Sequence, residues 1–580
     1  MVGGSSVGVT ASDMVPCPAA MLLAALACAS PTRPPAPATA TRGTPLAPAE
    51  SIYAATRDLR DRIDVALAGG RHEIAGGTPI VALLPRYDSL RGRLEGRLSA
   101  VDSSALGPDD SRALDIMRRT LSHDLGPVVL PNATAAASTS GGPSPVPEPR
   151  PECGYDPDSI ARATHGLDSL RARVYACYGW AQSHVAAGDD TLDRLTILGA
   201  LGHTDDAARR RQLFLRLEPV WRSVNGDGGA ASPYRRLFAL EVETLGSGEP
   251  PTATQARASG VPPDSLEPWL LRILETWRDA TPDSLVEPWD WYYLVGRTSR
   301  ALSPRIPREW LARLNAAVWR ALGADVDALR VHYDLDPRDG KDPVAFTTFG
   351  GRTPVEPWVF ATYRAGGLDN LNELLHETGH AVHLAAIRTR PAFRDWPDSD
   401  PFTEAVADVV ALDVYEPAWQ QRWLGDSVPL AAGLQSRYGG IVLDVAWAMF
   451  ELRMLHEPDA DPNLVWAALT RDYLHIRPHP ELSWWAMRGQ LVDAPGYMVN
   501  YAAGAILIAA IRARIQAAHG PFIEGDTSWY GWMAQRLYRF GLERPTREVL
   551  EAFLGGPVSP AALLADMRRM RGAERPGTSR

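Results

Sequence analysis

The sequence predicts a large, mostly α-helical fold that carries one small β-sheet. Apolar residues recur at helical spacing through most of the chain, as in 51–68, where Ile52, Leu59 and Ile63 follow this period. Alternating aromatic and β-branched residues are concentrated in a single region, 328–363. The chain has 580 residues, 45% of them hydrophobic, so it can bury a large core. Length alone suggests roughly two to four domains.

Amphipathic helices are predicted on both sides of that region. Before it they cover 51–68, parts of 90–121, then 167–187, 207–224, 234–245, 264–280 and 307–322. After it they cover 443–455, 463–473 and 500–516. Residues 132–151 are rich in Ala, Ser, Gly and Pro, which is typical of an exposed insertion.

Three strands are predicted within the alternating region, at 328–333, 344–349 and 358–363. They come directly before the most distinctive helix of the chain. The edge of such a sheet has unpaired N–H and C=O groups that could pair with an extended peptide.

The helix after these strands contains the motif His376-Glu377-Thr378-Gly379-His380. Leucines at 371, 374 and 375 give the run one apolar helical face. On a helix His376 and His380 share a face and lie roughly 6 Å apart, so both imidazoles can bind one ion. Glu377 lies about 100° round the helix from His376, too far to be a ligand beside both histidines. It is well placed to take a proton from water activated by a metal, and this pattern is typical of a zinc peptidase.

A third protein ligand is required, because a catalytic zinc site combines three protein ligands with one open position. Ala386 stands where a metzincin has its third histidine. His383 lies one turn beyond His380 with little reach back to the metal, so we assign it to the structure.

Glu404, 24 positions after His380, is the better third ligand. Pro401 and Thr403 resemble a helix start with Thr403 as the N-cap, which places Glu404 in the first turn of a second helix. Asp408 follows at i+4 and can accept the free N–H of a ligating histidine, which fixes its tautomer.

Charge and hydropathy exclude other classes of partner. The net charge of −10 argues against nucleic acid and leaves no basic patch for a membrane surface. We find no apolar run of the roughly 18 residues needed to span a bilayer.

The N-terminus resembles a targeting segment. Residues 19–27 form a short apolar run of small residues that ends before Cys28, as in a signal peptide or a bacterial lipoprotein leader with Cys28 as the lipid anchor. No basic residue precedes Arg33, so an ill-defined leader without targeting function stays open. We predict a leader at 1–28, a Pro/Ala/Thr tether at 29–49, and export to the bacterial cell envelope or periplasm rather than a cytoplasmic location.

Cys153 and Cys177 remain as an even pair if the leader is removed or acylated. They can form a disulfide in an oxidising compartment or remain buried free thiols, and the sequence does not decide between these states.

Several segments between residues 330 and 570 resemble the thimet oligopeptidase and oligoendopeptidase F family of zinc peptidases (gluzincin type). The similar segments are 340–341, 345–346, 360–370, the motif region 376–383, the tyrosine segment 496–504 and the end region 544–560. The run 402–408, which contains the predicted third ligand, is more similar to angiotensin-converting enzyme.

The resemblance implies a mostly helical fold with a deep substrate channel and the small sheet next to the active-site helix. It implies one zinc ion per chain, held by His376, His380 and Glu404, with Glu377 as general base. Tyr501 matches a tyrosine that donates a hydrogen bond to the oxyanion, and Tyr497, one turn earlier, would bind or orient the substrate. Purely structural roles for the two tyrosines in the core stay open.

We therefore predict a monomeric zinc peptidase that hydrolyses oligopeptides. Residues 50–325 would form one wall of the channel and 326–575 the zinc catalytic region. Two alternatives stay open: a dipeptidyl carboxypeptidase, which trims chain ends, and a non-catalytic, zinc-stabilised binding protein.

Overall fold

A computed structural model describes residues 45–130, 153, 166–187, 190–229, 231–338, 341 and 344–573. The predicted leader 1–28, most of the tether and the insertion 132–151 lie outside these residues. Helices dominate the described chain and its strands form only small sheets, which confirms the mostly α prediction. The described residues from 45 onward belong to one compact unit, and the predicted boundary between 325 and 326 falls within it.

Three helices and a short hairpin open the described chain: α1 (Ala47–Ala68), β1 (Glu73–Ile74), β2 (Thr78–Pro79), α2 (Ile80–Ser99) and α3 (Pro108–His123). The tether was predicted to reach residue 49, but α1 already begins at Ala47. Pro48 lies in its first turn, where the missing N–H of proline costs nothing.

A second group of helices follows: α5 (Leu167–Ser183), α6 (Arg194–His203), α7 (Ala207–Leu215), α8 (Glu218–Asn225), α9 (Pro233–Leu245), α10 (Pro251–Ala258), α11 (Pro263–Ala280), α12 (Pro288–Val295), α13 (Arg297–Leu302) and α14 (Leu311–Ala321). The predicted helix 167–187 ends at Ser183, because β3 (Val185–Ala187) pairs with β4 (Asp190–Leu192). Two helices, α7 and α8, replace the single one predicted at 207–224. Cys177 of α5 forms a disulfide with Cys153.

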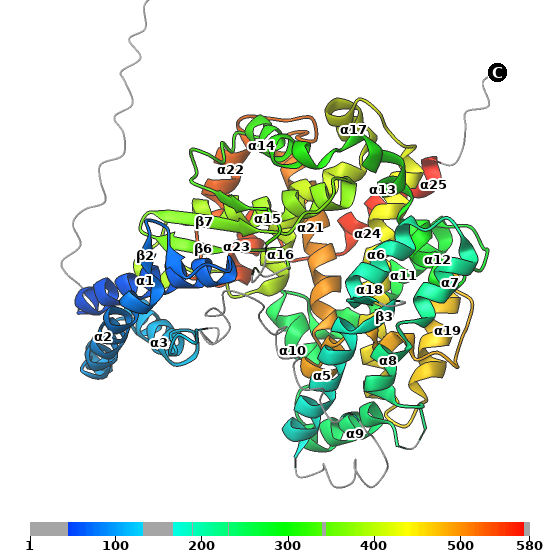
Figure 1. The fold of residues 1–580 in the computed structure, drawn as a ribbon, viewed down its shortest axis with the longest axis horizontal. Helices are drawn as coiled ribbons and strands as arrows, with labels where there is room; N and C mark the ends of the chain where they lie inside the picture. The colour runs from blue at the N-terminus through cyan, green and yellow to red at the C-terminus, as the bar shows by residue number, and fades with distance from the viewer. Residues whose placement is uncertain are drawn as a thin grey trace, which may run out of the picture. The chain divides into compact units, whose positions relative to one another are not determined.

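The predicted small sheet contains β5 (His332–Asp334), β6 (Phe346–Arg352) and β7 (Val355–Phe360), in the order β5-β7-β6. β5 runs parallel to β7, and β6 runs antiparallel to it. β6 extends past the predicted end at 349, because Gly351 and Arg352 continue the pairing with β7 after a register shift at Gly350. The sheet packs against α15 (Leu368–Ala386), the helix with the motif, while α1 packs against β6 (Figure 1).

The start of α15 is anchored by the loop before α14. Gly367 has φ +110°, a conformation that favours glycine, and its N–H donates to the carbonyl of Ile306. The N–H of Leu368 donates to the hydroxyl of Ser303. From Leu374 to Ala386 nearly every side chain is buried, so α15 runs through the core.

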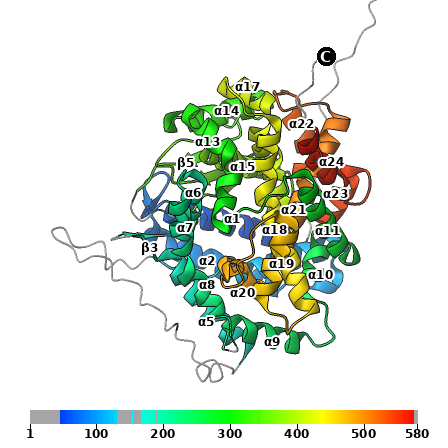
Figure 2. The ribbon, with the colours of Figure 1, turned by 90° about the vertical axis from the view of Figure 1, so that its right-hand side faces the viewer.

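The remaining helices are α16 (Asp400–Ala411), α17 (Pro417–Leu424), α18 (Leu430–His456), α19 (Pro462–Leu474), α20 (Gln490–Asp493), α21 (Met498–Ala518), α22 (Trp529–Met533), α23 (Thr546–Leu554), α24 (Ala561–Met567) and α25 (Arg569–Ala573). The long helices α18 and α21 pack side by side (Figure 2). Among the described residues, α21 is the one helix long and apolar enough to cross a membrane by length and composition, and 72% of the relevant window is buried within the protein.

Candidate metal centre

The metal centre depends on a close crossing of α15 and α16. Gly379 lies at the crossing, where a Cβ would come within 2.7 Å of Cα of Ala407. Real Cβ atoms do not approach another carbon this closely, so only glycine permits the observed spacing. The crossing brings α16 beside the two motif histidines.

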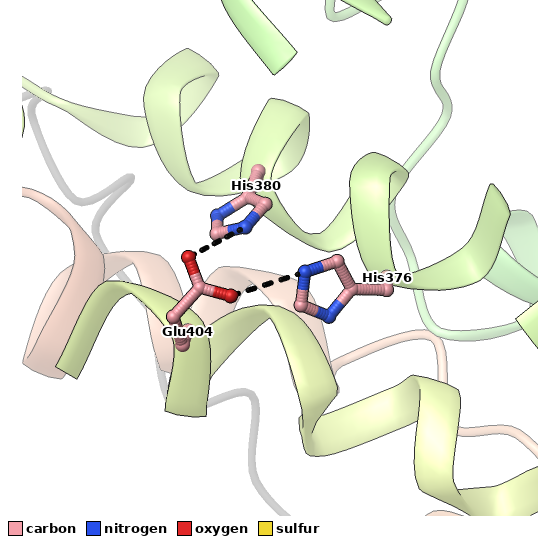
Figure 3. Close-up of side chains that lie close together, drawn as sticks. All are labelled: His376, His380 and Glu404. Atoms are coloured by element: carbon pink, nitrogen blue, oxygen red, sulfur yellow. Dashed lines mark ion pairs between the residues drawn. The ribbon is translucent and has the colours of Figure 1, made fainter. Parts of the chain in front are cut away.

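Three side chains from these helices converge on one point (Figure 3). Nε2 of His376 lies 3.3 Å from one carboxylate oxygen of Glu404, and Nε2 of His380 lies 3.6 Å from the other. The potential ligand atoms of the three residues all lie within 4.8 Å of one another. The structure thus brings together the three ligands predicted from the sequence.

Acidic groups around His376 favour a positive charge in the centre. Nδ1 of His376 lies 2.7 Å from a carboxylate oxygen of Asp408, one turn after Glu404. Burial alone lowers the pKa of His376, but Asp408 and Glu404 together raise it well above its ordinary value. The same arrangement holds the imidazole in one orientation with Nε2 toward Glu404.

The zinc that the resemblance implies fits these residues. Two imidazole nitrogens and one carboxylate form the ligand set of a catalytic zinc site, and the flanking carboxylate of Asp408 orients one histidine. The Glu404 side chain is 55% exposed, while that of His380 is 9% exposed, so the centre is open to solvent on one side. A site with one accessible side leaves room for water or substrate.

The start of α16 differs from the prediction. The N-cap is Ser399, and Asp400 and Pro401 form the first turn, because proline suits the first positions of a helix. The hydroxyl of Thr403 donates to the carbonyl of Asp400 instead of capping the helix. Glu404 therefore lies in the second turn, not the first.

Glu377 is buried beside the sheet. Glu377 is 6% exposed. The hydroxyl of Thr347 on β6 lies 2.7 Å from Oε2 of Glu377 and 2.8 Å from the backbone carbonyl oxygen of Glu377. The strand that precedes α15 thus fixes the carboxylate predicted to be the general base. Thr347 was not identified from the sequence.

Tyr497 and Tyr501 lie at the start of α21, which packs against α16. Their rings are 5.7 Å apart, and the charge of Glu404 contributes to raising the pKa of each phenol, after the larger effect of burial. The amide of Gln490 donates to the Tyr501 hydroxyl oxygen over 3.1 Å, and the guanidinium of Arg488 lies 5.5 Å from the Tyr501 ring centre. Both groups lower the pKa of the Tyr501 phenol and so oppose the effect of burial. Because Gln490 donates to the phenolic oxygen, the O–H of Tyr501 is left to donate to another acceptor.

His383 lies in the core, as assigned from the sequence. It is 0% exposed, and its ring contacts Trp396, Phe402 and Tyr538. Burial lowers its pKa to about 3, so it is neutral at physiological pH. Trp396 also packs edge-on against His380 at 5.5 Å between ring centres, which restricts that ligand's orientation.

One of the residues around the metal centre that were not identified from the sequence does have a signal in it. A glycine in the middle of a helix costs roughly 1 kcal/mol relative to alanine, so Gly379 inside an apolar helix indicates a close packing partner. Thr347, Gln490 and Trp396 have no local signal, because they reach the centre through distant parts of the chain.

No family model and no curated protein sequence matches this chain. Solved structures do: an M32 carboxypeptidase from Deinococcus radiodurans R1 has a TM-score of 0.51 at 14% identity, covering 91% of this chain and 99% of that one. PZ peptidase A, solved with an inhibitor, has a TM-score of 0.52 at 14% identity, covering 89% of this chain and 86% of that one. At this identity the comparison establishes the fold alone: the chain has the mostly helical fold of these two structures, as the resemblance implied.

Proposed function

We propose that this protein is a zinc-dependent peptidase that hydrolyses peptide bonds in oligopeptides. The observation that carries the proposal is the convergence of His376, His380 and Glu404 beside a buried glutamate on the same helix. The similarity of the fold to a carboxypeptidase and to another peptidase supports it. The deep substrate channel that the resemblance implies stays a prediction.

One zinc ion, bound by the two histidines and Glu404, would act as a Lewis acid toward the substrate carbonyl and lower the pKa of water to about 7. Asp408 keeps the imidazole of His376 in the orientation that binds the ion, because it accepts the N–H of Nδ1. Nδ1 of His380 has no hydrogen-bond partner among the described residues. The Trp396 ring fixes that histidine by packing instead.

Glu377 serves as general base and then as general acid. Its carboxylate accepts a proton from the attacking water and returns it to the nitrogen of the leaving amine. The hydroxyl of Thr347 holds one of its oxygens, which leaves the other free for this transfer. Glu377 comes from the motif helix itself, so its position relative to the histidines is fixed by helix geometry.

Tyr501 donates its phenolic hydrogen to the oxyanion that develops as water attacks. Removing such a donor typically costs about 2.7–4 kcal/mol of transition-state stabilisation. Gln490 donates to the same phenolic oxygen, so the amide supports negative charge there while the phenol proton points elsewhere. Tyr497, whose ring contacts that of Tyr501, binds or orients the substrate.

The test combines metal removal with replacement of the base. Wild-type protein should cleave a fluorogenic peptide, lose this activity with a chelator and regain it with zinc. Glu377→Gln should bind zinc as wild type does and lose nearly all turnover. The matched control is Glu95→Gln, an exposed glutamate of α2, which should retain activity. Wild-type turnover in Glu377→Gln would exclude this mechanism.

Cleavage at the C-terminal end is the second candidate, favoured by the similarity to a carboxypeptidase. A dipeptidyl carboxypeptidase requires a free C-terminal carboxylate, whereas an endopeptidase accepts a blocked end. Mass spectrometry of products from one peptide with a free and with an amidated C-terminus separates the two. A zinc-loaded protein that binds peptides without cleaving either would instead be the non-catalytic binding protein.

We also propose that the protein acts as a monomer outside the cytoplasm. The Cys153–Cys177 disulfide supports export, because disulfides persist in oxidising compartments and are rare in the cytosol. Cys28, the proposed lipid anchor, lies outside the described residues. Metabolic labelling with a fatty-acid analogue, compared between wild type and Cys28→Ser, tests the anchor, and size-exclusion chromatography with light scattering tests the oligomeric state.

A further inference from the structure

A carboxylate from a neighbouring helix holds the start of α21, the helix that carries both tyrosines. Glu451 of α18 is 7% exposed, and its two oxygens accept separate backbone N–H groups. The N–H of Gly496 donates to Oε1 over 2.7 Å, and the N–H of Met498 donates to Oε2 over 3.2 Å. These two residues directly flank Tyr497.

The start of α21 needs such a partner. The first N–H groups of any helix lack partners within the helix, and the N-cap residue here, Tyr497, makes no capping hydrogen bond with its side chain. An acidic group near a helix N-terminus also interacts favourably with the helix dipole. Glu451 therefore replaces the local cap that the sequence of this segment does not provide.

The opposite side of the segment is held by α10. Gly496 has φ +82°, and a Cβ there would lie 2.6 Å from the carbonyl carbon of Pro251 and 2.8 Å from the backbone nitrogen of Thr252. The backbone at 496 thus lies between the start of α10 and the carboxylate of Glu451. A segment fixed from both sides holds the tyrosine that follows in one place.

We infer that Glu451 is a positioning residue for Tyr501: its carboxylate fixes the start of α21 so that the Tyr501 phenol lies where it can donate to the oxyanion. The inference deepens the proposed function and rests on it, because it assigns Glu451 a role through Tyr501. Nothing places Glu451 in contact with substrate.

The ionisation state of Glu451 gives this arrangement a pH dependence. Burial raises the pKa of Glu451 to about 8, although the N–H groups of Gly496 and Met498 lower it. Glu241 of α9 raises it further, and this glutamate is itself paired with Arg171 of α5 at 2.8 Å.

Tyr234 of α9, also beside Glu451, has a pKa raised well above its ordinary value by burial, so it stays neutral. The ionised carboxylate, present above pH 8, accepts both N–H groups more strongly than the protonated acid does.

The first experiment is a double-mutant cycle of Glu451→Gln and Tyr501→Phe, assayed on a fluorogenic peptide at pH 9. Glutamine keeps the shape of the side chain, but its amide nitrogen cannot accept an N–H. We expect Glu451→Gln to lower kcat about tenfold with KM unchanged, because a misplaced group in an active site costs up to about 100-fold. In the Tyr501→Phe background the same change should lower kcat less than twofold.

Glu241→Gln is the matched control, since it removes a neighbouring carboxylate that does not touch α21. Its kcat should stay within twofold of wild type in both backgrounds. A tenfold loss from Glu451→Gln in both backgrounds would overturn the link to Tyr501, and so would an equal loss from Glu241→Gln.

The second experiment does not depend on activity. Hydrogen–deuterium exchange of a peptide covering 494–502 should be faster in Glu451→Gln than in wild type at pH 9, and unchanged exchange would overturn the contact itself. If the variant does not fold, wild-type protein alone gives the same test. After correction for intrinsic exchange rates, the protection of residues 494–502 against exchange should increase from pH 7 to pH 9. Constant protection would count against the inference. If wild type shows no chelator-sensitive cleavage, the proposed function fails, while the exchange experiment still decides whether Glu451 holds the segment.

Discussion

Replacing Gly379 by alanine tests how strictly the metal centre depends on the crossing of α15 and α16. A Cβ at 379 would lie 2.7 Å from Cα and 2.9 Å from the carbonyl carbon of Ala407. Because packed carbons lie about 3.5–4.0 Å apart, the helices must separate by roughly 1 Å to admit it. Zinc–ligand distances tolerate about 0.2 Å, so Glu404 would move too far from the histidines to share their ion. We expect zinc affinity to fall at least about tenfold, a loss of about 1.4 kcal/mol or more.

The folded state should survive this change. Alanine is about 0.8–1.0 kcal/mol more favourable than glycine within a helix, while overpacking costs about 1–3 kcal/mol. The net loss in unfolding free energy of the metal-free protein is therefore about 0–2 kcal/mol. Thermal unfolding without metal measures this loss in unfolding free energy separately from zinc binding.

Competition with a chromophoric chelator gives the zinc dissociation constant of Gly379→Ala. Gly504→Ala is the matched control, because Gly504 also faces α16 and a Cβ there would lie 3.8 Å from the carbonyl oxygen of Pro401, an ordinary contact. The control should bind zinc as wild type does. Wild-type affinity in Gly379→Ala would refute the argument that the crossing distance sets the ligand geometry.

Three further changes act on single contacts. Asp408→Asn should weaken zinc binding about 10–100-fold in the same competition assay, because His376 loses the carboxylate that orients it; unchanged affinity would contradict this role. Thr347→Val should bind zinc normally and lower kcat about tenfold, because Glu377 loses a hydrogen bond of about 1.5 kcal/mol. A wild-type kcat in steady-state kinetics would contradict this role of Thr347. Burial raises the pKa of Glu451 from 4.5 to about 8, so between these values the folded protein holds a proton that the unfolded chain has released. The unfolding free energy of wild type should therefore fall as pH rises, by up to about 1.4 kcal/mol per pH unit. Urea unfolding at pH 5.5 and at pH 7.5 measures this fall, which should be about 2 kcal/mol smaller in Glu451→Gln than in wild type. An equal fall in both proteins would exclude the raised pKa.

Local spacing explains why the convergence of the candidate ligands could be predicted from the sequence. His376 and His380 are separated by one helical turn, so any helix at this position places them on one face. Glu404 and Asp408 repeat the same spacing, and a loop between the two helices is long enough to bring them together. For these four residues the secondary structure alone fixes most of the geometry.

The rest of the site depends on packing between distant segments. Gln490 reaches Tyr501 from α20, and Glu451 reaches the start of α21 from α18, but neither residue belongs to a motif that indicates its partner. The start of α16 was misplaced because Thr403 and Ser399 are both good N-cap residues. The position of Pro401, two residues after Ser399, is the observation that favours the true start.

Helix α16 links the two halves of the proposed chemistry. One side of it approaches α15 at Gly379, and Glu404 reaches the histidines from there. Its first turn approaches α21 at Gly504, one turn after Tyr501, and Arg512 of α21 donates to the carbonyl of Val409. A shift of α16 would therefore change the metal ligands and the distance to the tyrosines together. Glu451 of α18 holds the start of the same helix, so the separation between Tyr501 and the metal centre depends on this contact as well as on α16.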